Sequence, residues 1–167
     1  MKHNHGFTLI EILIVVVIIS ILTVLGVQMT NSGSVERNLQ QQGQILQSSI
    51  EYACDQAVLQ NIPYGVKFAL NGYTFSRFYQ QQWLDIETEY LFPHLFNQGF
   101  MLNLEIDDQN LVLDEDFSEI PQLLCDANGQ LSEFVAKITD ATELHGYQVK
   151  SDGLWQKTGR ASCRERV

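Results

Sequence analysis

The sequence predicts an α+β fold in which one long N-terminal helix packs on a domain of antiparallel strands. Two patterns along the 167 residues support this prediction. Residues 7–60 combine an apolar run with helical periodicity, whereas the residues after Pro63 alternate between apolar and polar side chains with a period of two. Because one helix precedes several short strands, we expect the strands to form one antiparallel sheet or two small ones against it.

The first element is an almost unbroken run of Ile, Leu and Val at residues 7–27. At a rise of about 1.5 Å per residue the run is about 31 Å long, close to the ~30 Å hydrocarbon thickness of a bilayer. It is therefore predicted to be a transmembrane helix half, with the end that carries Lys2 in the cytoplasm. A secretory signal peptide fits less well, because the run is too long and lacks a cleavage site between small residues.

The helix is expected to continue to about residue 60 as an amphipathic, periplasmic half, residues 28–60. The polar stretch at residues 28–34 predicts a helix break or a weakened turn where the chain leaves the membrane. Apolar residues then recur at about 100° per residue until Pro63 ends the helix. The predicted buried stripe consists of Val35, Leu39, Leu46, Ile50, Ala53 and Ala57.

Residues 61–158 are predicted to form the antiparallel β domain. Turn signals at Asn71-Gly72, at residues 126–129 and at residues 151–153 predict three hairpins. The aromatic residues between positions 73 and 83 are expected to enter the core on one face and to offer a subunit contact on the other. The expected strands are residues 64–70 and 73–79, one starting at Trp83, 100–106, 121–125, 131–138, 147–150 and 154–156.

Charge and cysteine content narrow the possible functions. The formal net charge of −10 disfavours binding to nucleic acid through phosphate contacts. Cys54, Cys125 and Cys163 all lie outside the cytoplasm in this topology, where disulfides persist. A Cys54–Cys125 bridge would connect the helix to the distal sheet, but nothing in the spacing requires it, and two buried free thiols are the favoured interpretation.

No catalytic site, metal site or cofactor is predicted. His94 and His145 lie on separate expected segments without Cys or Asp at ligand spacing, and we expect both to be surface or loop residues. No nucleotide-binding or hydrolase motif occurs. The acidic stretch at residues 107–119 lacks the Asp-x-Asp-x-Asp-Gly pattern of a calcium loop, so we interpret it as a solvated loop that offers a contact surface.

Residues 6–11 read Gly-Phe-Thr-Leu-Ile-Glu and open the apolar run. Glu11 is the only charge in that run, and a carboxylate at such depth costs about 2.5–3.5 kcal/mol, so it needs a partner or a function. The pattern resembles the class III leader of type IV pilins and type II secretion pseudopilins. The resemblance implies that residues 1–6 are a leader peptide, that a prepilin peptidase cuts after Gly6, that Phe7 is then N-methylated, and that Glu11 assists filament assembly.

An ion pair between subunits would give this resemblance a physical basis. In staggered neighbours, the Glu11 carboxylate of one chain would meet the Phe7 ammonium of another in a medium of low dielectric constant. Each charge would then offset the cost of burying the other.

Residues 55–68 resemble the minor pseudopilin H family of type II secretion systems, as do residues 72–75, Trp83 and residues 129–134, and the resemblance covers roughly residues 6–157. It implies a noncatalytic subunit at or near the tip of a periplasmic pseudopilus, which helps to assemble it and to export folded proteins across the outer membrane. The implied partners are other major and minor pseudopilins, the prepilin peptidase, the inner-membrane assembly platform and the secreted substrate. The implied location is the inner membrane of a Gram-negative bacterium, crossed once, with the β domain in the periplasm.

Residues 159–167 do not fit this pattern, because they are rich in arginine and follow the last expected strand. We interpret them as an artefact at the end of the sequence or a disordered tail, the alternative being a genuine basic tail.

Two other functions stay open at this point. A minor type IV pilin that primes pilus assembly would carry the same leader, although the acidic surface argues against DNA uptake. A membrane-anchored periplasmic binding protein or enzyme would make the leader match accidental. It would predict no cleavage after Gly6 and full tolerance of Glu11→Ala.

Overall fold

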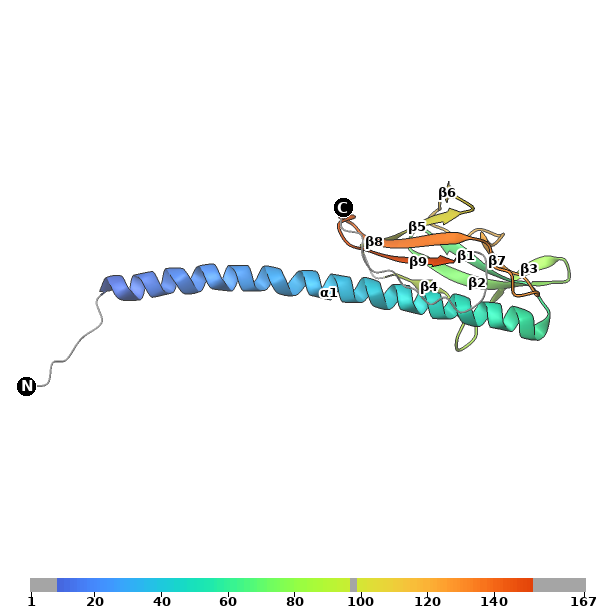
Figure 1. The fold of residues 1–167 in the computed structure, drawn as a ribbon, viewed down its shortest axis with the longest axis horizontal. Helices are drawn as coiled ribbons and strands as arrows, with labels where there is room; N and C mark the ends of the chain where they lie inside the picture. Colours follow the sequence, from blue (N-terminus) through green and yellow to red (C-terminus); the bar gives the residue numbers. More distant parts are fainter. Residues whose placement is uncertain (1–8, 97–98, 152–167) are drawn as a thin grey trace, which may run out of the picture. The chain divides into compact units, whose positions relative to one another are not determined.

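The computed structural model describes residues 9–96 and 99–151, and it describes the helical side chains outside residues 23–33. The chain divides into two compact units, Met1–Arg37 and Asn38–Val167. One helix, α1 (Leu9–Gln60), begins in the first unit and ends in the second, where the strands follow it (Figure 1). The helix runs without a break through residues 28–34, and the predicted order of a long helix and then antiparallel strands is confirmed.

The C-terminal part of α1 packs on the β domain through the predicted stripe. Gly43 lies on the same face, and a Cβ at this position would be 1.9 Å from Cδ1 of Tyr147. The missing side chain therefore makes room for the aromatic ring of Tyr147, which is buried. The stripe residues that are at most 2% exposed are Leu39, Leu46, Ile50, Ala53 and Ala57.

The helix ends at Gln60, three residues before Pro63, in a defined capping motif. Asn61 has a φ of 55°, in the left-handed region that asparagine tolerates. Its amide donates to the carbonyl of Val58, and the amide of Ile62 donates to that of Ala57. This hydrogen-bond pair is a Schellman motif, so local sequence ends the helix before the proline is reached.

The first sheet is antiparallel and has β1 (Tyr64–Ala69) at its centre. β1 pairs with β2 (Gly72–Tyr79) on one side and with β7 (Leu123–Cys125) on the other. β2 also pairs with β3 (Gln82–Ile86) and with the short strand β4 (His94–Leu95). All residues of β1 are buried, because both faces of this strand are covered.

The two faces of the first sheet differ in chemistry. The core face carries aromatic and aliphatic side chains from opposite positions of β1 and β2, such as the pair Phe68 and Tyr73, each 1% exposed. The outer face is covered by the segment before β7. There a Cβ on Gly65 would lie 2.4 Å from Cγ of Pro121, so glycine allows that segment to pack closely. The Gln122 side chain continues the ladder beyond β7, since it both donates to and accepts from the backbone of Phe68.

The first hairpin forms, but its loop differs from the predicted one. Ala69 pairs with Gly72, so Leu70 and Asn71 form the loop, and neither has a positive φ. Gly72 serves another purpose, because a Cβ there would lie 2.4 Å from the carbonyl oxygen of His94 in β4. Glycine is thus required at this position by the close approach of a neighbouring strand rather than by turn geometry.

The second sheet consists of β6 (Gln109–Leu111), β5 (Phe100–Ile106), β8 (Phe134–Asp140) and β9 (Gly146–Ser151), in that order. Its pairs are antiparallel, so the prediction of antiparallel strands is confirmed, and of the two arrangements left open the protein has two sheets. The amide of Leu102 donates to the carbonyl of Leu70, which connects the two sheets. The buried, inward-facing residues of the second sheet are Leu102, Leu104, Phe134, Ala136, Ile138, Tyr147 and Val149.

The predicted second hairpin is wrong. Residues 126–129 do turn, with Gly129 at a φ of 78°, but β7 before them belongs to the first sheet and β8 after them to the second. The two sides of the turn meet at the bridge between Cys125 and Leu131 and at the hydrogen bond from the Asp126 amide to the carbonyl of Gln130. The predicted third hairpin, around residues 151–153, extends outside the described residues and stays a prediction. Its first strand, β9, pairs with β8.

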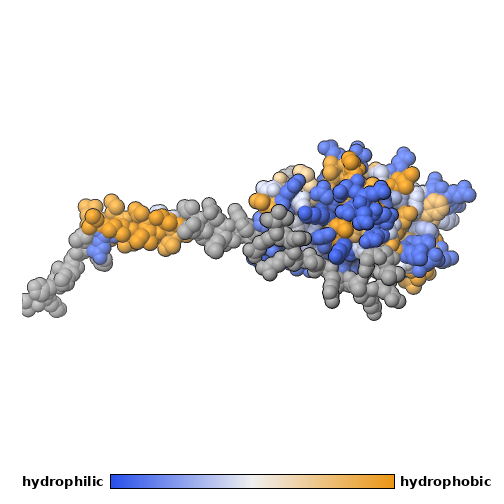
Figure 2. Space-filling model, turned by 45° about the horizontal axis from the view of Figure 1, so that its top comes forward, coloured by the Kyte–Doolittle hydropathy of each residue, from blue (hydrophilic) through white to orange (hydrophobic). Residues whose placement is uncertain are grey.

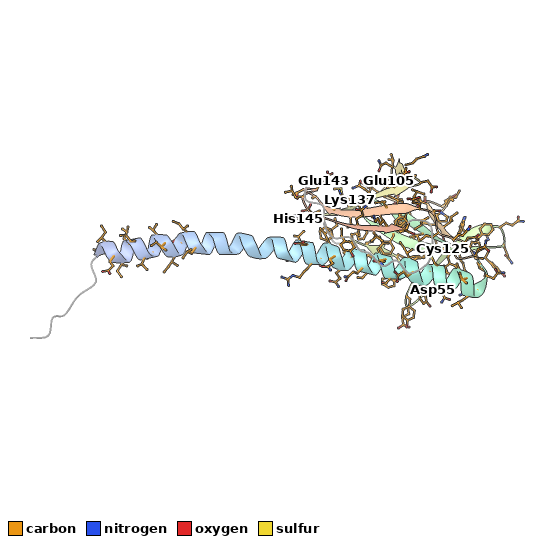
Figure 3. The ribbon with its side chains drawn as sticks, in the orientation of Figure 1. Asp55, Glu105, Cys125, Lys137, Glu143 and His145 are labelled. Atoms are coloured by element: carbon orange, nitrogen blue, oxygen red, sulfur yellow. A yellow bond between two sulfur atoms is a disulfide. The ribbon has the colours of Figure 1, made fainter. Side chains whose placement is uncertain are left out.

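Cys54 of α1 and Cys125 of β7 form a disulfide, with their Cα atoms 5.1 Å apart. The interpretation of these residues as two free thiols is therefore wrong. Cys125, labelled in Figure 3, ends the strand that borders β1. The bridge joins the helix to the first sheet.

Candidate assembly site

Residues 9–22 of α1 expose apolar side chains on every side. The Ile, Leu and Val residues of this segment are between 46% and 86% exposed, and Figure 2 shows the segment as an almost continuous hydrophobic surface. In the part of the chain that the structure describes, no helix is long and apolar enough to span a membrane. The predicted span, residues 7–27, extends beyond the described side chains at both ends and stays a prediction.

Glu11 lies in the first turn of the described helix and is exposed. It is the only charged residue between positions 9 and 22, so a counter-charge must come from outside this segment. Gly6 and Phe7, the predicted sites of cleavage and methylation, lie outside the described residues. The structure therefore places the Glu11 carboxylate, and the roles of Gly6, Phe7 and Glu11 stay predictions.

The prediction for His94 as a surface or loop residue is wrong. This side chain is half-buried in β4, its ring stacks on Tyr73 with 5.1 Å between ring centroids, and a ring nitrogen hydrogen-bonds to Oε1 of Gln42 on α1. Burial lowers the pKa of His94, which favours the neutral ring. His94 therefore fastens β4 to the helix and to β2. The signal that sequence reasoning missed is Gln42, which lies between Leu39 and Leu46 at stripe spacing.

The remaining candidates for metal binding are dispersed. Within residues 9–96 and 99–151, no three His, Cys, Asp or Glu side chains form a group that could hold a metal ion. His145 is partly exposed in the turn before β9, with Nδ1 3.3 Å from a carboxylate oxygen of Asp140. Asp107 and Asp108 form the β5–β6 turn with positive φ angles, and the acidic residues at positions 114–119 are exposed.

The aromatic residues of the first hairpin divide between core and surface as predicted. Tyr73 and Phe75 are each 1% exposed, and burial raises the pKa of Tyr73 well above its ordinary value. Phe78 and Tyr79 are 38% and 48% exposed, and the ring of Phe78 packs on Trp83 with 5.2 Å between centroids. A subunit contact on this surface stays a prediction.

Comparison with known proteins assigns the family. The family described as the prokaryotic N-terminal methylation motif matches residues 1–27. The chain is 32% identical over 165 residues to type II secretion system protein H of Pseudomonas aeruginosa, and the match covers 92% of this chain and 94% of that protein. The chain belongs to the type II secretion system protein H family. This membership identifies it as a minor pseudopilin of type II secretion, and it favours that machine over a type IV pilus.

Solved structures agree with the H-family fold. The minor pseudopilin EpsH of the Vibrio cholerae type 2 secretion system has a TM-score of 0.58 at 15% identity, over 68% of this chain and 88% of that one. The solution structure of Escherichia coli GspH has a TM-score of 0.55 at 16% identity, over 73% of this chain and 87% of that one. At these identities the likeness supports the fold alone. Pseudopilins are structural proteins, so membership implies contacts with other pseudopilins and with the secretion machinery.

Proposed function

We propose that this chain is a noncatalytic subunit at or near the tip of a periplasmic pseudopilus, where it helps to assemble the pseudopilus and to export folded proteins. In this proposal the chain is cleaved after Gly6, methylated at Phe7 and held in the inner membrane by residues 7–27 until it is assembled. The match of residues 1–27 to the methylation motif supports the processing steps.

The observation that carries the proposal is the apolar surface of residues 9–22, interrupted only by Glu11. Moving such a side chain out of water is worth about 1.5–3 kcal/mol, so the segment needs lipid or protein around it. A membrane would cover it before assembly, and the helices of sister subunits would cover it afterwards. The same apolar surface then serves both as an anchor and as the packing surface of a filament.

Glu11 would determine which neighbouring subunit packs against this one and how far the two helices are offset along their axes. Its carboxylate gains little from its own chain, whereas the ammonium at Phe7 of a neighbouring subunit would neutralise it in a medium of low dielectric constant. The ion pair would replace two costly buried charges by one compensated pair, so subunits would pack best at the offset that brings the two groups together.

Processing is tested by measuring the intact mass and the N-terminal sequence of membrane-extracted protein, made with and without a prepilin peptidase. We expect a start at Phe7 with one added methyl group only when the peptidase is present. Gly6→Ala should be cut poorly, because a side chain at this position should fit the peptidase badly. Normal processing of this variant, or a Met1 start in both hosts, would contradict the proposal.

Assembly is tested with Glu11→Gln, which removes the charge at nearly constant size. We expect this variant to be inserted and cleaved normally but to be incorporated poorly into the pseudopilus. Ser20→Ala is the matched control, because the Ser20 hydroxyl donates to the carbonyl of Val16 within the same helix. Equal incorporation of Glu11→Gln and wild type would refute the ion pair. Loss of surface pili with intact protein secretion in a deletion strain would refute the choice of machine.

A further inference from the structure

The outer face of the first sheet contains a pocket that the proposed function does not use. Lys67 of β1 lies opposite Thr74 of β2, and Ser76 of β2 lies opposite Asp85 of β3, so these four side chains share the face away from Phe68. Residues before β7 close over them and leave a cavity of about 260 Å³. We call it the outer pocket. It is lined by Lys67, Thr74, Asp85, Ile86, Glu87, Pro93, Phe117, Ser118 and Glu119.

The floor of the outer pocket presents buried hydrogen-bond donors with unused capacity. Lys67 is 5% exposed, and its ammonium contacts Oδ1 of Asp85 at 2.6 Å. An ammonium has three donors, and among the described residues Asp85 is the one hydrogen-bond partner of this group. The Thr74 side chain, also 5% exposed, has no hydrogen bond to any described residue. Both side chains line the pocket, where an occupant can accept their remaining hydrogen bonds, so this floor suits an acceptor such as a peptide carbonyl.

The rim of the outer pocket carries negative charge, whereas its floor presents hydrogen-bond donors. The side chain of Asp85 is 67% exposed, and Glu87 and Glu119 are exposed as well. Three carboxylates against the one ammonium of Lys67 make the lining net negative, on a chain whose formal net charge is −10. Pro93 and Phe117 add apolar walls that would contact the stem of a long side chain. The rim is therefore complementary to a cation on a flexible aliphatic stem.

We propose that the outer pocket binds a short extended segment of a partner protein that carries an arginine. A backbone carbonyl of the segment accepts hydrogen bonds from Lys67 and Thr74 at the floor. The guanidinium lies between Glu87 and Glu119 at the rim, where charge-assisted hydrogen bonds are the strong ones. The proposal deepens the proposed function by naming the chemistry of a partner, but binding in the outer pocket requires neither processing nor filament assembly.

The test uses the full chain in detergent and a capped Gly-Arg-Gly peptide as the probe. Binding is followed by the NMR shifts of the Thr74 and Phe117 amides during a titration. A second peptide replaces arginine by citrulline, which keeps the shape and removes the charge. We expect saturable binding of the arginine peptide and binding that is about tenfold weaker with citrulline, which corresponds to about 1.4 kcal/mol.

Matched charge variants distinguish binding in the outer pocket from attraction of the peptide by the overall negative charge of the protein. Glu87→Gln with Glu119→Gln should weaken binding of the arginine peptide about tenfold. The control, Asp107→Asn with Asp108→Asn, removes the same charge from the β5–β6 turn and should change the affinity less than twofold. Equal effects of the two pairs, equal binding of the two peptides, or shifts that never saturate would each overturn the proposal. These outcomes do not depend on Gly6 or Glu11, so a failure of the processing or assembly proposal leaves the result interpretable.

Discussion

The disulfide between Cys54 and Cys125 should supply a large part of the stability of the β domain. It closes a loop between residues 71 positions apart. In the chain-entropy model, cross-linking a loop of this length raises the free energy of the unfolded chain by about 4.4 kcal/mol at 25 °C. A typical domain has a total stability of about 5–15 kcal/mol, so loss of the bridge should bring this domain close to unfolding at growth temperature.

Urea unfolding of the detergent-extracted chain, followed by tryptophan fluorescence, measures this contribution. At a slope of about 2 kcal/mol per M, the variant with both Cys54→Ala and Cys125→Ala should unfold at a urea concentration about 2 M lower than wild type. Reduced wild-type protein is the matched control, because it keeps both sulfur atoms and loses only the cross-link. If reduction shifts the midpoint by less than about 0.5 M, the loop-closure reasoning is wrong for this protein.

Three further predictions test the packing of the β domain by urea unfolding. Gly43→Ala should cost about 1–3 kcal/mol by overpacking against Tyr147, and an unchanged midpoint would show that the ring moves freely. Asp85→Ala should destabilise the protein by about 1–3 kcal/mol, because it leaves the Lys67 ammonium buried without a counter-charge. Lys67→Met should destabilise it less, and a larger loss of stability for Lys67→Met than for Asp85→Ala would contradict this explanation. Because the pKa of His94 is lowered in the fold, the unfolded chain binds a proton at this histidine at a higher pH than the folded chain does. The free energy of unfolding should therefore fall as the pH drops below about 6.5. His94→Gln should flatten this pH dependence, and an unchanged pH profile in the variant would contradict the role of His94.

Local patterns were sufficient to predict the helix and most of the strands. The apolar stripe from Leu39 to Ala57 has a helical period because one face of α1 is buried. Strand β5 has the predicted bounds, since its alternation is regular and one of its faces lies in the core. The leader residues were sufficient to indicate the pilin-like class, because the motif that defines it is a short stretch of sequence within residues 1–27.

Features that depend on pairing between distant segments were not predictable in this way. The turn at residues 126–129 resembles a hairpin turn, but nothing local shows that β7 and β8 join different sheets. Gly72 looked like a turn residue, whereas its role depends on β4, more than twenty residues later. The outer pocket was missed for the same reason, since the strand pattern predicts that Lys67 faces solvent, whereas Phe117, Ser118 and Glu119 lie over it in the fold.

The arrangement of covalent links also has a mechanical consequence for a subunit that is pulled through its helix. The helix is joined covalently to the first sheet at two places, the chain at Pro63 and the disulfide at Cys54, and both lie near its C-terminal end. Its contacts further back, such as those of Leu39 and Leu46, are noncovalent. A load applied at the N-terminal side would therefore detach the helix from Leu39 onward, and the separation would stop at Cys54. Under tension the bridge would act as a stop that keeps the first sheet attached even when most of the helix interface has opened.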